Sequence, residues 1–254
     1  MNDDLRAARD NLRHTYVELA RNVPGTSVHQ RGQFTQTVST APLTICNMVI
    51  DCQIPEADVA QVVADFRLAS GRSKAFRVFQ ASGDQPEDLG LWLMAEGFTL
   101  EYSLALMTRP ADPDDVPAAM RLVETDAERR TVIDFMVGTF FSRRDPALRR
   151  FVMEANLRSP FELWVCGSPG SPPEGAVMLV DRPESLGMYN LCVAPRRRRE
   201  GVGSGILHFC QAQASARGKI FTFQADSRMV VWYRERGGIE IGSVKIYTNP
   251  HKMR

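Results

Sequence analysis

The sequence predicts an α+β fold, a central mixed β-sheet flanked by helices, and it predicts this arrangement twice along the chain. The 254 residues are enough for one large domain or two small ones. Segments with the two-residue period of strands alternate with segments of helical period, in the order strand, helix, strand, helix, strand. This order starts near residue 46 and again near residue 188, an offset of 142 residues. We interpret the repeated order as a duplication.

The N-terminal part begins with a helix. It is expected at residues 3–22, with Leu5, Leu12 and Leu19 on one stripe and a stop at Pro24 and Gly25. Polar, weakly patterned chain follows to about residue 40. The first copy then contains a strand at 44–52, a helix at 56–69, a strand at 75–80, a helix at 86–95 and a strand at 98–107.

A proline- and acid-rich linker at 110–115 separates an N-terminal domain, 1–109, from a C-terminal domain, 116–254, and is expected to be too polar to pack well. The C-terminal domain opens with a strand at 116–123, helices at 127–141 and 147–156, and strands at 161–166 and 176–180. The second copy follows as a strand at 188–193, a helix at 203–217, a strand at 219–225, a helix at 227–236 and a strand at 239–247.

Composition excludes several classes of protein. The 31 basic and 30 acidic residues nearly cancel, which removes the electrostatic case for nucleic acid or an anionic membrane as the main partner. No apolar run approaches the roughly 18 residues of a membrane span, and we expect the charged start not to be a secretory signal. Five scattered cysteines indicate buried thiols in a reducing compartment, so we expect a cytoplasmic protein. The four histidines lack metal-site spacing, so no metal is expected.

The most informative stretch is residues 188–207. A strand ends near Pro195, four arginines follow at 196–199, and glycines at 201, 203 and 205 open an amphipathic helix. Glycines allow a ligand to approach the backbone closely, and the first N–H groups of a helix have no internal partner. With the positive end of the helix dipole, they predict a site for phosphate oxygens, to which Arg198 or Arg199 would add charge.

Two other phosphate-binding motifs fit this stretch poorly. A P-loop requires a lysine after its last glycine, and none is present here. A dinucleotide fingerprint requires a third glycine where Ile206 stands, although Asp226 ends the next strand where a ribose-binding acid could lie. Only 49 residues follow Gly205, too few to complete a doubly wound domain.

The pattern Val193-Ala-Pro-x-x-Arg198-x-x-Gly201-x-Gly203 resembles the acetyl-coenzyme A (acetyl-CoA) loop of the GNAT superfamily of N-acetyltransferases. The pattern Asp226-x-x-Met-x-x-Trp-Tyr233-x-x-x-Gly237 resembles the last helix of that family. The likeness covers roughly 116–249, and the whole chain resembles bacterial tandem GNAT proteins in which only the C-terminal half keeps the loop.

Gly238 replaces the family's usual phenylalanine and is expected to loosen packing under the last strand. Asp226 replaces a common asparagine or serine, which puts a cofactor contact there in doubt.

The resemblance implies direct transfer of an acetyl group from acetyl-CoA to an amine in a ternary complex. The strand at 191–193 would part from its parallel neighbour at 220–225 to admit pantetheine, with an oxyanion-stabilising N–H near Val193. Tyr233 would protonate the leaving thiolate. The proton of the amine could go to Glu154, to Glu162 or to water held by Asn190, and this choice stays open. The cofactor would contact Leu191, Cys192, Val193, Arg198, Arg199, Glu200, Gly201, Val202, Gly203 and Ser204.

The first copy lacks such a loop. Its corresponding segment, 51–58, has no glycine and three acids, which would repel a polyphosphate. We therefore expect no cofactor there, and a structural role for residues 1–109 that includes one wall of the acceptor cleft. Further acceptor contacts are expected from 135–141 and 181–187. We expect the acceptor to be a small-molecule or protein amine, and a homodimer stays open.

Two alternatives to an enzyme remain. The chain could be a regulatory module that binds coenzyme A (CoA) without catalysis, because Asp226 and Gly238 differ from the residues that the family usually has at these positions. It could also be a purely structural tandem domain, which would bind no acyl-CoA.

Overall fold

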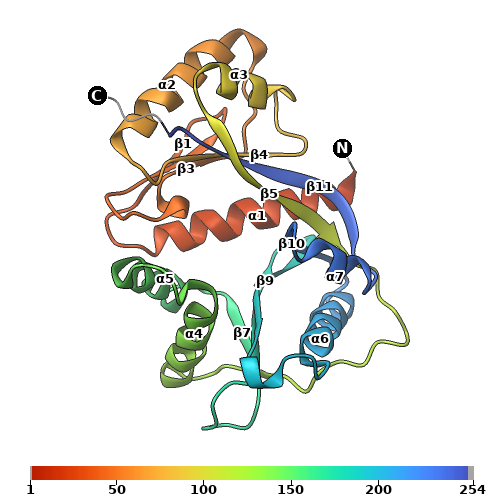
Figure 1. Ribbon diagram of the computed structural model, residues 1–254. Helices are drawn as coiled ribbons and strands as arrows, with labels where there is room; N and C mark the ends of the chain where they lie inside the picture. Colours follow the sequence, from red (N-terminus) through yellow and green to blue (C-terminus); the bar gives the residue numbers. More distant parts are fainter. Residues whose placement is uncertain (1, 251–254) are drawn as a thin grey trace.

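The computed structural model describes residues 2–250 and confirms the predicted α+β class. Eleven strands form one mixed sheet in the order β1-β2-β3-β4-β11-β5-β10-β9-β8-β7-β6. Helix α1 runs between two lobes, one bearing α2 and α3 and the other bearing α4, α5 and α6 (Figure 1). The helices are α1 (Asp3–Arg21), α2 (Val59–Arg72), α3 (Leu89–Ala95), α4 (Asp126–Phe141), α5 (Pro146–Leu157), α6 (Val202–Ala216) and α7 (Val230–Arg234).

The strands are short in the N-terminal lobe and longer near the centre of the sheet. They are β1 (Ser27–Gln30), β2 (Thr35–Val38), β3 (Met48–Ile50), β4 (Arg77–Ala81), β5 (Thr99–Thr108), β6 (Arg121–Leu122), β7 (Glu162–Cys166), β8 (Gly175–Asp181), β9 (Ser185–Val193), β10 (Ile220–Asp226) and β11 (Ile239–Thr248).

Three helix starts, those of α1, α4 and α5, follow from local capping chemistry. The Thr125 hydroxyl accepts the N–H of Glu128, so α4 begins where the sequence offers this cap. Asp145 caps α5 in the same way, with Pro146 at the first helical position. The predicted helices at 3–22, 127–141, 147–156 and 203–217 agree with α1, α4, α5 and α6 to within a residue at each end, and side-chain caps fix the starts of the first three.

Two strand predictions were wrong in extent, and two strands were missed. The polar, weakly patterned chain before residue 40 contains β1 and β2. The predicted strand at 44–52 shrinks to β3, because Thr44–Cys46 forms a 3-10 turn. The predicted strand at 116–123 shrinks to β6, because Ala118 donates its N–H to the carbonyl of Gly205 (2.8 Å) and so runs against α6.

The two copies exchange their last strands. β5, from the first copy, lies between β10 and β11, and β11, from the second, pairs with both β5 and β4. The ends of the linker pack, contrary to expectation, since Arg109 is buried and its Nη2 lies 2.6 Å from Asp115 Oδ1. The division into 1–109 and 116–254 stays a prediction, within a sheet that is continuous across it.

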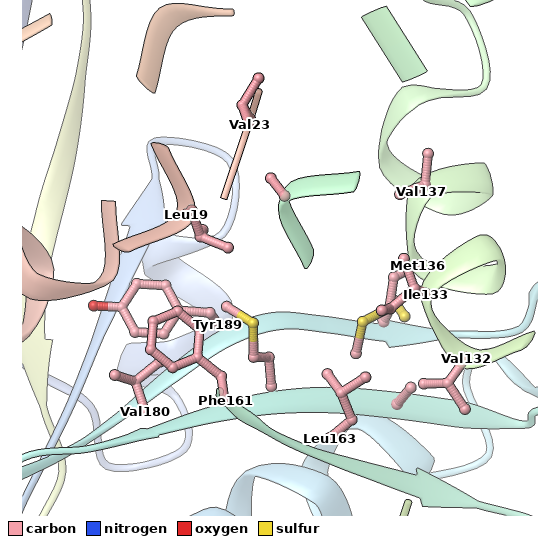
Figure 2. Packing of buried hydrophobic residues seen from close by; sticks show 14 of the residues in the cluster. Leu19, Val23, Val132, Ile133, Met136, Val137, Phe161, Leu163, Val180 and Tyr189 are labelled. Carbon is pink, nitrogen blue, oxygen red and sulfur yellow. The ribbon is translucent and has the colours of Figure 1, made fainter. Parts of the chain in front are cut away.

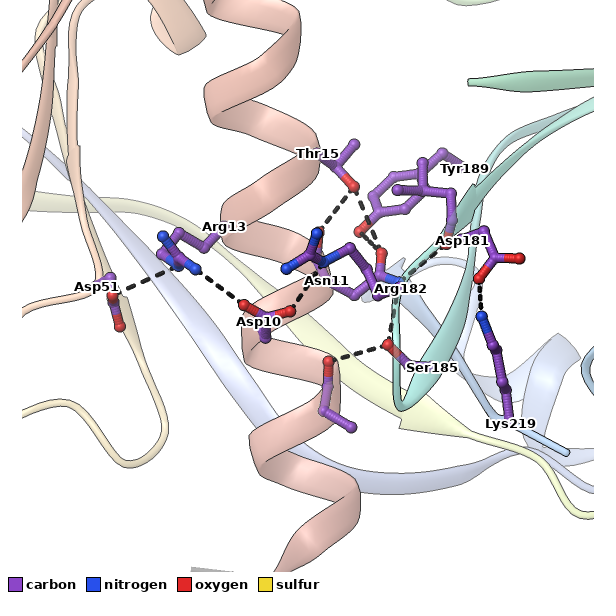
Figure 3. A network of polar contacts seen from close by, with 12 residues as sticks. Asp10, Asn11, Arg13, Thr15, Asp51, Asp181, Arg182, Ser185, Tyr189 and Lys219 are labelled. Carbon is purple, nitrogen blue, oxygen red and sulfur yellow. Dashed lines mark hydrogen bonds and ion pairs between the residues drawn. The ribbon is translucent and has the colours of Figure 1, made fainter. Parts of the chain in front are cut away.

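Helix α1 ties the halves together through a polar network (Figure 3). Asn11 is fully buried; its Nδ2 donates to Val180 O (3.0 Å) and Ser185 Oγ (3.1 Å), and its Oδ1 accepts from the Tyr189 hydroxyl (3.0 Å). A side chain at Gly187 would overlap Asn11, so this glycine lets α1 lie directly on β9.

Apolar clusters cover both faces of the C-terminal part of the sheet. On one face, Ile133, Met136 and Val137 of α4 point toward Leu163 and other strand residues, and Leu19 of α1 joins them (Figure 2). On the other face, α6 packs through side chains that include Ile206, Leu207 and Cys210. The sheet therefore separates an α4–α5 side from an α6 side.

We expect Asn11→Ala to lower the free energy of unfolding by about 2 to 4 kcal/mol, because three buried polar groups on β8 and β9 each lose a hydrogen bond. Urea unfolding measures this loss. Arg21→Ala is the control: it removes an exposed pair with Glu18 and should cost less than about 1 kcal/mol. Equal losses in the two variants would contradict the assigned role of Asn11.

Candidate functional site

Strands β9 and β10 part in the middle of the sheet. Their parallel pairing begins at Ser185 and Ile220 and ends at Met188 and Phe223. Beyond that point β9 pairs only with β8, and a register shift between Met178 and Ala176 places two residues of β9 opposite one of β8. One residue of this bulge, Asn190, has a left-handed backbone with φ 54°. The bulge bends β9 and leaves a gap beside residues 189–193, where the resemblance implied one.

The loop after β9 presents a row of backbone N–H groups. Arg199 and Gly201 have left-handed backbones (φ 67° and 81°), and α6 begins at Val202. Its first internal hydrogen bond runs from Gly205 N to Gly201 O (2.9 Å). Within residues 2–250, the N–H groups of 199–204 donate to no protein acceptor. Such a row at the positive end of a helix favours a bound anion.

The four arginines differ in their surroundings. Arg197 pairs with Glu174 (3.3 Å) and Glu200 (2.5 Å), so its charge is neutralised within the protein. Arg198 is exposed and its Nε donates to Val193 O (3.4 Å), while Arg199 is also exposed. In the described part of the chain neither Arg198 nor Arg199 lies within 4.0 Å of a carboxylate oxygen. These two arginines therefore contribute positive charge beside the loop.

A fifth cation at the loop was missed in the sequence. The Arg236 guanidinium stacks on the Trp232 ring, 4.2 Å from its centroid, and its Nε donates to Ser204 Oγ (2.8 Å). Arg236 thus stands at the start of α6 although it follows α7 in the chain. The i, i+4 spacing of Trp232 and Arg236 was the available signal, but it does not reveal which helix end the pair reaches.

The three glycines serve different purposes. Gly201 requires its left-handed backbone and has open space around it. At Gly203 an added Cβ would lie 3.6 Å from Trp232 and Val193, an ordinary contact. At Gly205 the Cβ would lie 3.1 Å from the backbone of Ala118. The expectation that all three glycines admit a ligand was therefore wrong for Gly205, which admits the neighbouring chain.

Tyr233 lies where the two strands part. Its ring packs on Phe223, the last residue of β10 that pairs with β9, with centroids 4.6 Å apart. Burial raises the pKa of its phenol well above the usual value, so the group keeps its proton at neutral pH.

The expectation of loose packing at Gly238 was wrong, because an added Cβ would meet the Tyr233 carbonyl at 2.8 Å. Gly238 lets the chain turn tightly against α7.

The residues of β9 that were predicted to contact the cofactor lie on both faces of the sheet. Leu191 and Val193 pack with the α6 cluster, whereas Cys192 belongs to the α4–α5 cluster. Burial raises the pKa of the Cys192 thiol to about 12, so this group stays a neutral thiol. All five cysteines are buried and unpaired.

Asp226, whose cofactor contact was in doubt, accepts the N–H of Met229 (3.2 Å) and pairs with Arg228 (2.5 Å).

A cavity of about 540 Å³ lies on the α4–α5 side and reaches Asn190. Of the three groups considered for the amine proton, Asn190 alone lines it. Glu154 pairs with Arg158 (3.1 Å) and Glu162 with Arg217 (2.9 Å), both away from the cavity. Only some of the segments predicted to contact the acceptor line this cavity. Residues of 135–141 and of the N-terminal half do, and those of 181–187 do not.

The corresponding gap in the first copy is closed. Beyond the parallel pairing of β3 and β4, Gln85 donates its N–H to Cys52 O (2.9 Å) and Ile54 donates to Gln85 O (3.0 Å). These bonds join the segments of the first copy that correspond to the parted ends of β9 and β10 in the second copy. The described residues hold no group of three or more potential metal ligands, and no helix among them is long and apolar enough to span a membrane.

Comparison with solved structures supports the resemblance at the level of fold. A GCN5-related N-acetyltransferase from Kribbella flavida superposes with a TM-score of 0.68 at 14% identity, covering 96% of each chain. A tandem GNAT protein from the clavulanic acid biosynthesis pathway has a TM-score of 0.59 at 12% identity, covering 95% of each chain. A GNAT-family acetyltransferase from Colwellia psychrerythraea has a TM-score of 0.54 at 12% identity, covering 85% of this chain and 81% of its own.

No family profile matches the sequence, and no curated protein does. The GNAT resemblance predicted from two short motifs is nevertheless confirmed in the fold, including its tandem form. At these identities the likeness establishes the fold alone, so the activity has to be argued from the site.

We expect Gly238→Ala to lower the free energy of unfolding by about 1 to 3 kcal/mol, because the new methyl group would collide with the backbone of Tyr233. Gly138→Ala in α4 is the matched control, since its Cβ meets nothing within 4 Å and should stabilise slightly. Thermal unfolding compares the two. A Gly238→Ala protein as stable as the control would show that the close approach is unimportant.

Proposed function

We propose that this protein is an acetyl-CoA-dependent N-acetyltransferase that acts on an amine. The proposal rests on one observation: the unpartnered N–H groups of 199–204 lie at the end of the strand that parts from β10. We assign catalysis to residues 116–254 and a structural role to residues 1–109. The buried, unpaired cysteines support a reducing compartment such as the cytoplasm.

The residues fit the cofactor. Its diphosphate would bind the N–H groups of 199–204, with added charge from Arg198 and Arg199, and Arg236, which also lies 3.6 Å from Glu235, would stand beside them. Its pantetheine would meet the edge of β9 at 189–193, which has no β10 partner. When bound, acetyl-CoA would supply a thioester that an amine can attack directly.

The chain's own groups would handle charge and protons. An N–H near Val193 would stabilise the developing oxyanion by ~3 kcal/mol. Tyr233 would hold a proton at its phenol oxygen for the leaving thiolate. An amine has a pKa of about 10, so its proton must be removed before attack. Asn190 would hold the water that accepts this proton, because it is the candidate group that lines the cavity.

A CoA-binding module without catalysis is the second candidate. It is favoured by the pairing of both candidate carboxylates, Glu154 and Glu162, with arginines away from the cavity. Incubation with acetyl-CoA and an amine panel distinguishes the two candidates, because only an enzyme releases free thiol above the buffer rate.

We expect Gly203→Glu to weaken acetyl-CoA binding at least about tenfold, since the new carboxylate would stand among the N–H groups that would hold the diphosphate. Isothermal calorimetry measures the affinity. Gly203→Ala is the control, because its methyl group fits beside Trp232 and brings no charge. Unchanged binding in Gly203→Glu would remove the proposed phosphate site.

Tyr233→Phe should lower kcat by about 10²-fold or more while leaving acetyl-CoA affinity nearly unchanged, because it removes a proton donor and keeps the packing on Phe223. Steady-state kinetics and calorimetry on the same preparation measure both quantities. Full activity in the variant would reduce Tyr233 to a packing role.

A further inference from the structure

The cavity beside Asn190 has a mainly apolar interior, in which Asn156 is a buried polar residue. Its buried walls come from α1, α4 and α5, with Leu19, Ile133, Met136 and Val137 among them. Its volume of about 540 Å³ lies in the range typical of sites for small molecules. Such walls favour an aliphatic or aromatic body and disfavour a strongly hydrated one.

The mouth of the cavity is charged, and the charge is unbalanced. The charged residues that line it are Lys74, Arg77, Glu101 and Arg144. Arg77 and Glu101 form a two-bond ion pair, with Nε–Oε2 at 2.5 Å and Nη2–Oε1 at 3.2 Å. In the described part of the chain Lys74 and Arg144 lie within 4.0 Å of no carboxylate oxygen. Two positive charges are thus left without a counter-charge.

The exposure of each lining side chain to solvent indicates its depth in the cavity. Lys74 and Arg144 are exposed, and so lie at the mouth, whereas the apolar walls are buried. Asn190, which is half-buried, comes from the bulge of β9 beside the proposed reaction centre. An occupant that reaches Asn190 would therefore pass apolar walls and leave its outer end among the cations.

We propose that the acceptor is a small amphipathic amine with an anionic group, a carboxylate, sulfonate or phosphate, at the end away from the reacting nitrogen. This inference rests on the proposed function. The amine would lie near Asn190, the body against α4 and α5, and the anion between Lys74 and Arg144. A lysine side chain on a protein supplies the amine without this anionic end, and the positive mouth would repel a basic segment.

Calorimetry with the CoA-saturated protein tests the acceptor class without depending on turnover. The probes are ω-aminooctanoate, n-octylamine, octanediamine and a short lysine-containing basic peptide. We expect ω-aminooctanoate to bind at least about tenfold more tightly than n-octylamine, and octanediamine and the peptide to bind most weakly. Equal affinities for the three small amines, or preference for the peptide, would overturn the proposal.

Variants of the mouth identify the groups responsible. Lys74→Ala and Arg144→Ala should each reduce the advantage of ω-aminooctanoate over n-octylamine, and Arg144→Glu should favour octanediamine. Arg143→Glu is the matched control, since its side chain is exposed next to Arg144 but does not line the cavity, and it should leave the preference unchanged. An equal effect of both charge reversals would mean that net charge alone acts, which would also overturn the proposal.

Failure of this proposal is distinct from failure of the proposed function. If acetyl-CoA binds and is consumed with amines but the anionic end confers no advantage, the acceptor class alone is wrong. If acetyl-CoA does not bind, the acetyltransferase proposal falls, and the acceptor class falls with it.

Discussion

The parting of β9 from β10 beyond Met188 and Phe223 is the constraint on which the rest of the site depends. A strand edge inside a sheet has backbone groups that need partners, so a gap there persists only where the surroundings hold it open. The bulge at Asn190 bends β9 away, and Tyr233 packs on Phe223 at the point of separation. Strand β9, which borders the gap, lines the cavity through Asn190 on the α4–α5 side and leads into the loop at 199–204 before α6.

The two copies of the fold resolve this gap in opposite ways. In the first copy, hydrogen bonds between Gln85 and residues 52–54 close it, and the connecting segment carries acids instead of glycines. In the second, β9 bulges and the loop that follows leaves its amides unpaired. One arrangement of strands and helices therefore yields a packed support in one half and an open site in the other.

The open half is built with material from the closed half. β5 lies between β10 and β11, α1 rests on β9 through Asn11 and Gly187, and residues such as Lys74 complete the cavity mouth. The first copy is thus joined to the candidate site by a continuous sheet and a buried polar network. This dependence gives a physical reason for a half without a loop of its own to remain part of the chain.

Local chemistry in the sequence determined the long helices, the duplicated order of elements and the glycine loop, because caps, periodicity and unpaired helix N–H groups act over a few residues. Tertiary structure alone decided the exchange of β5 and β11, the approach of Arg236 to Ser204, the packing role of Gly205 and the position of Asn190, rather than Glu154 or Glu162, in the lining of the cavity. Each of these joins residues distant in the chain, and pairing of distant segments follows from burial and register, which no short stretch of sequence encodes.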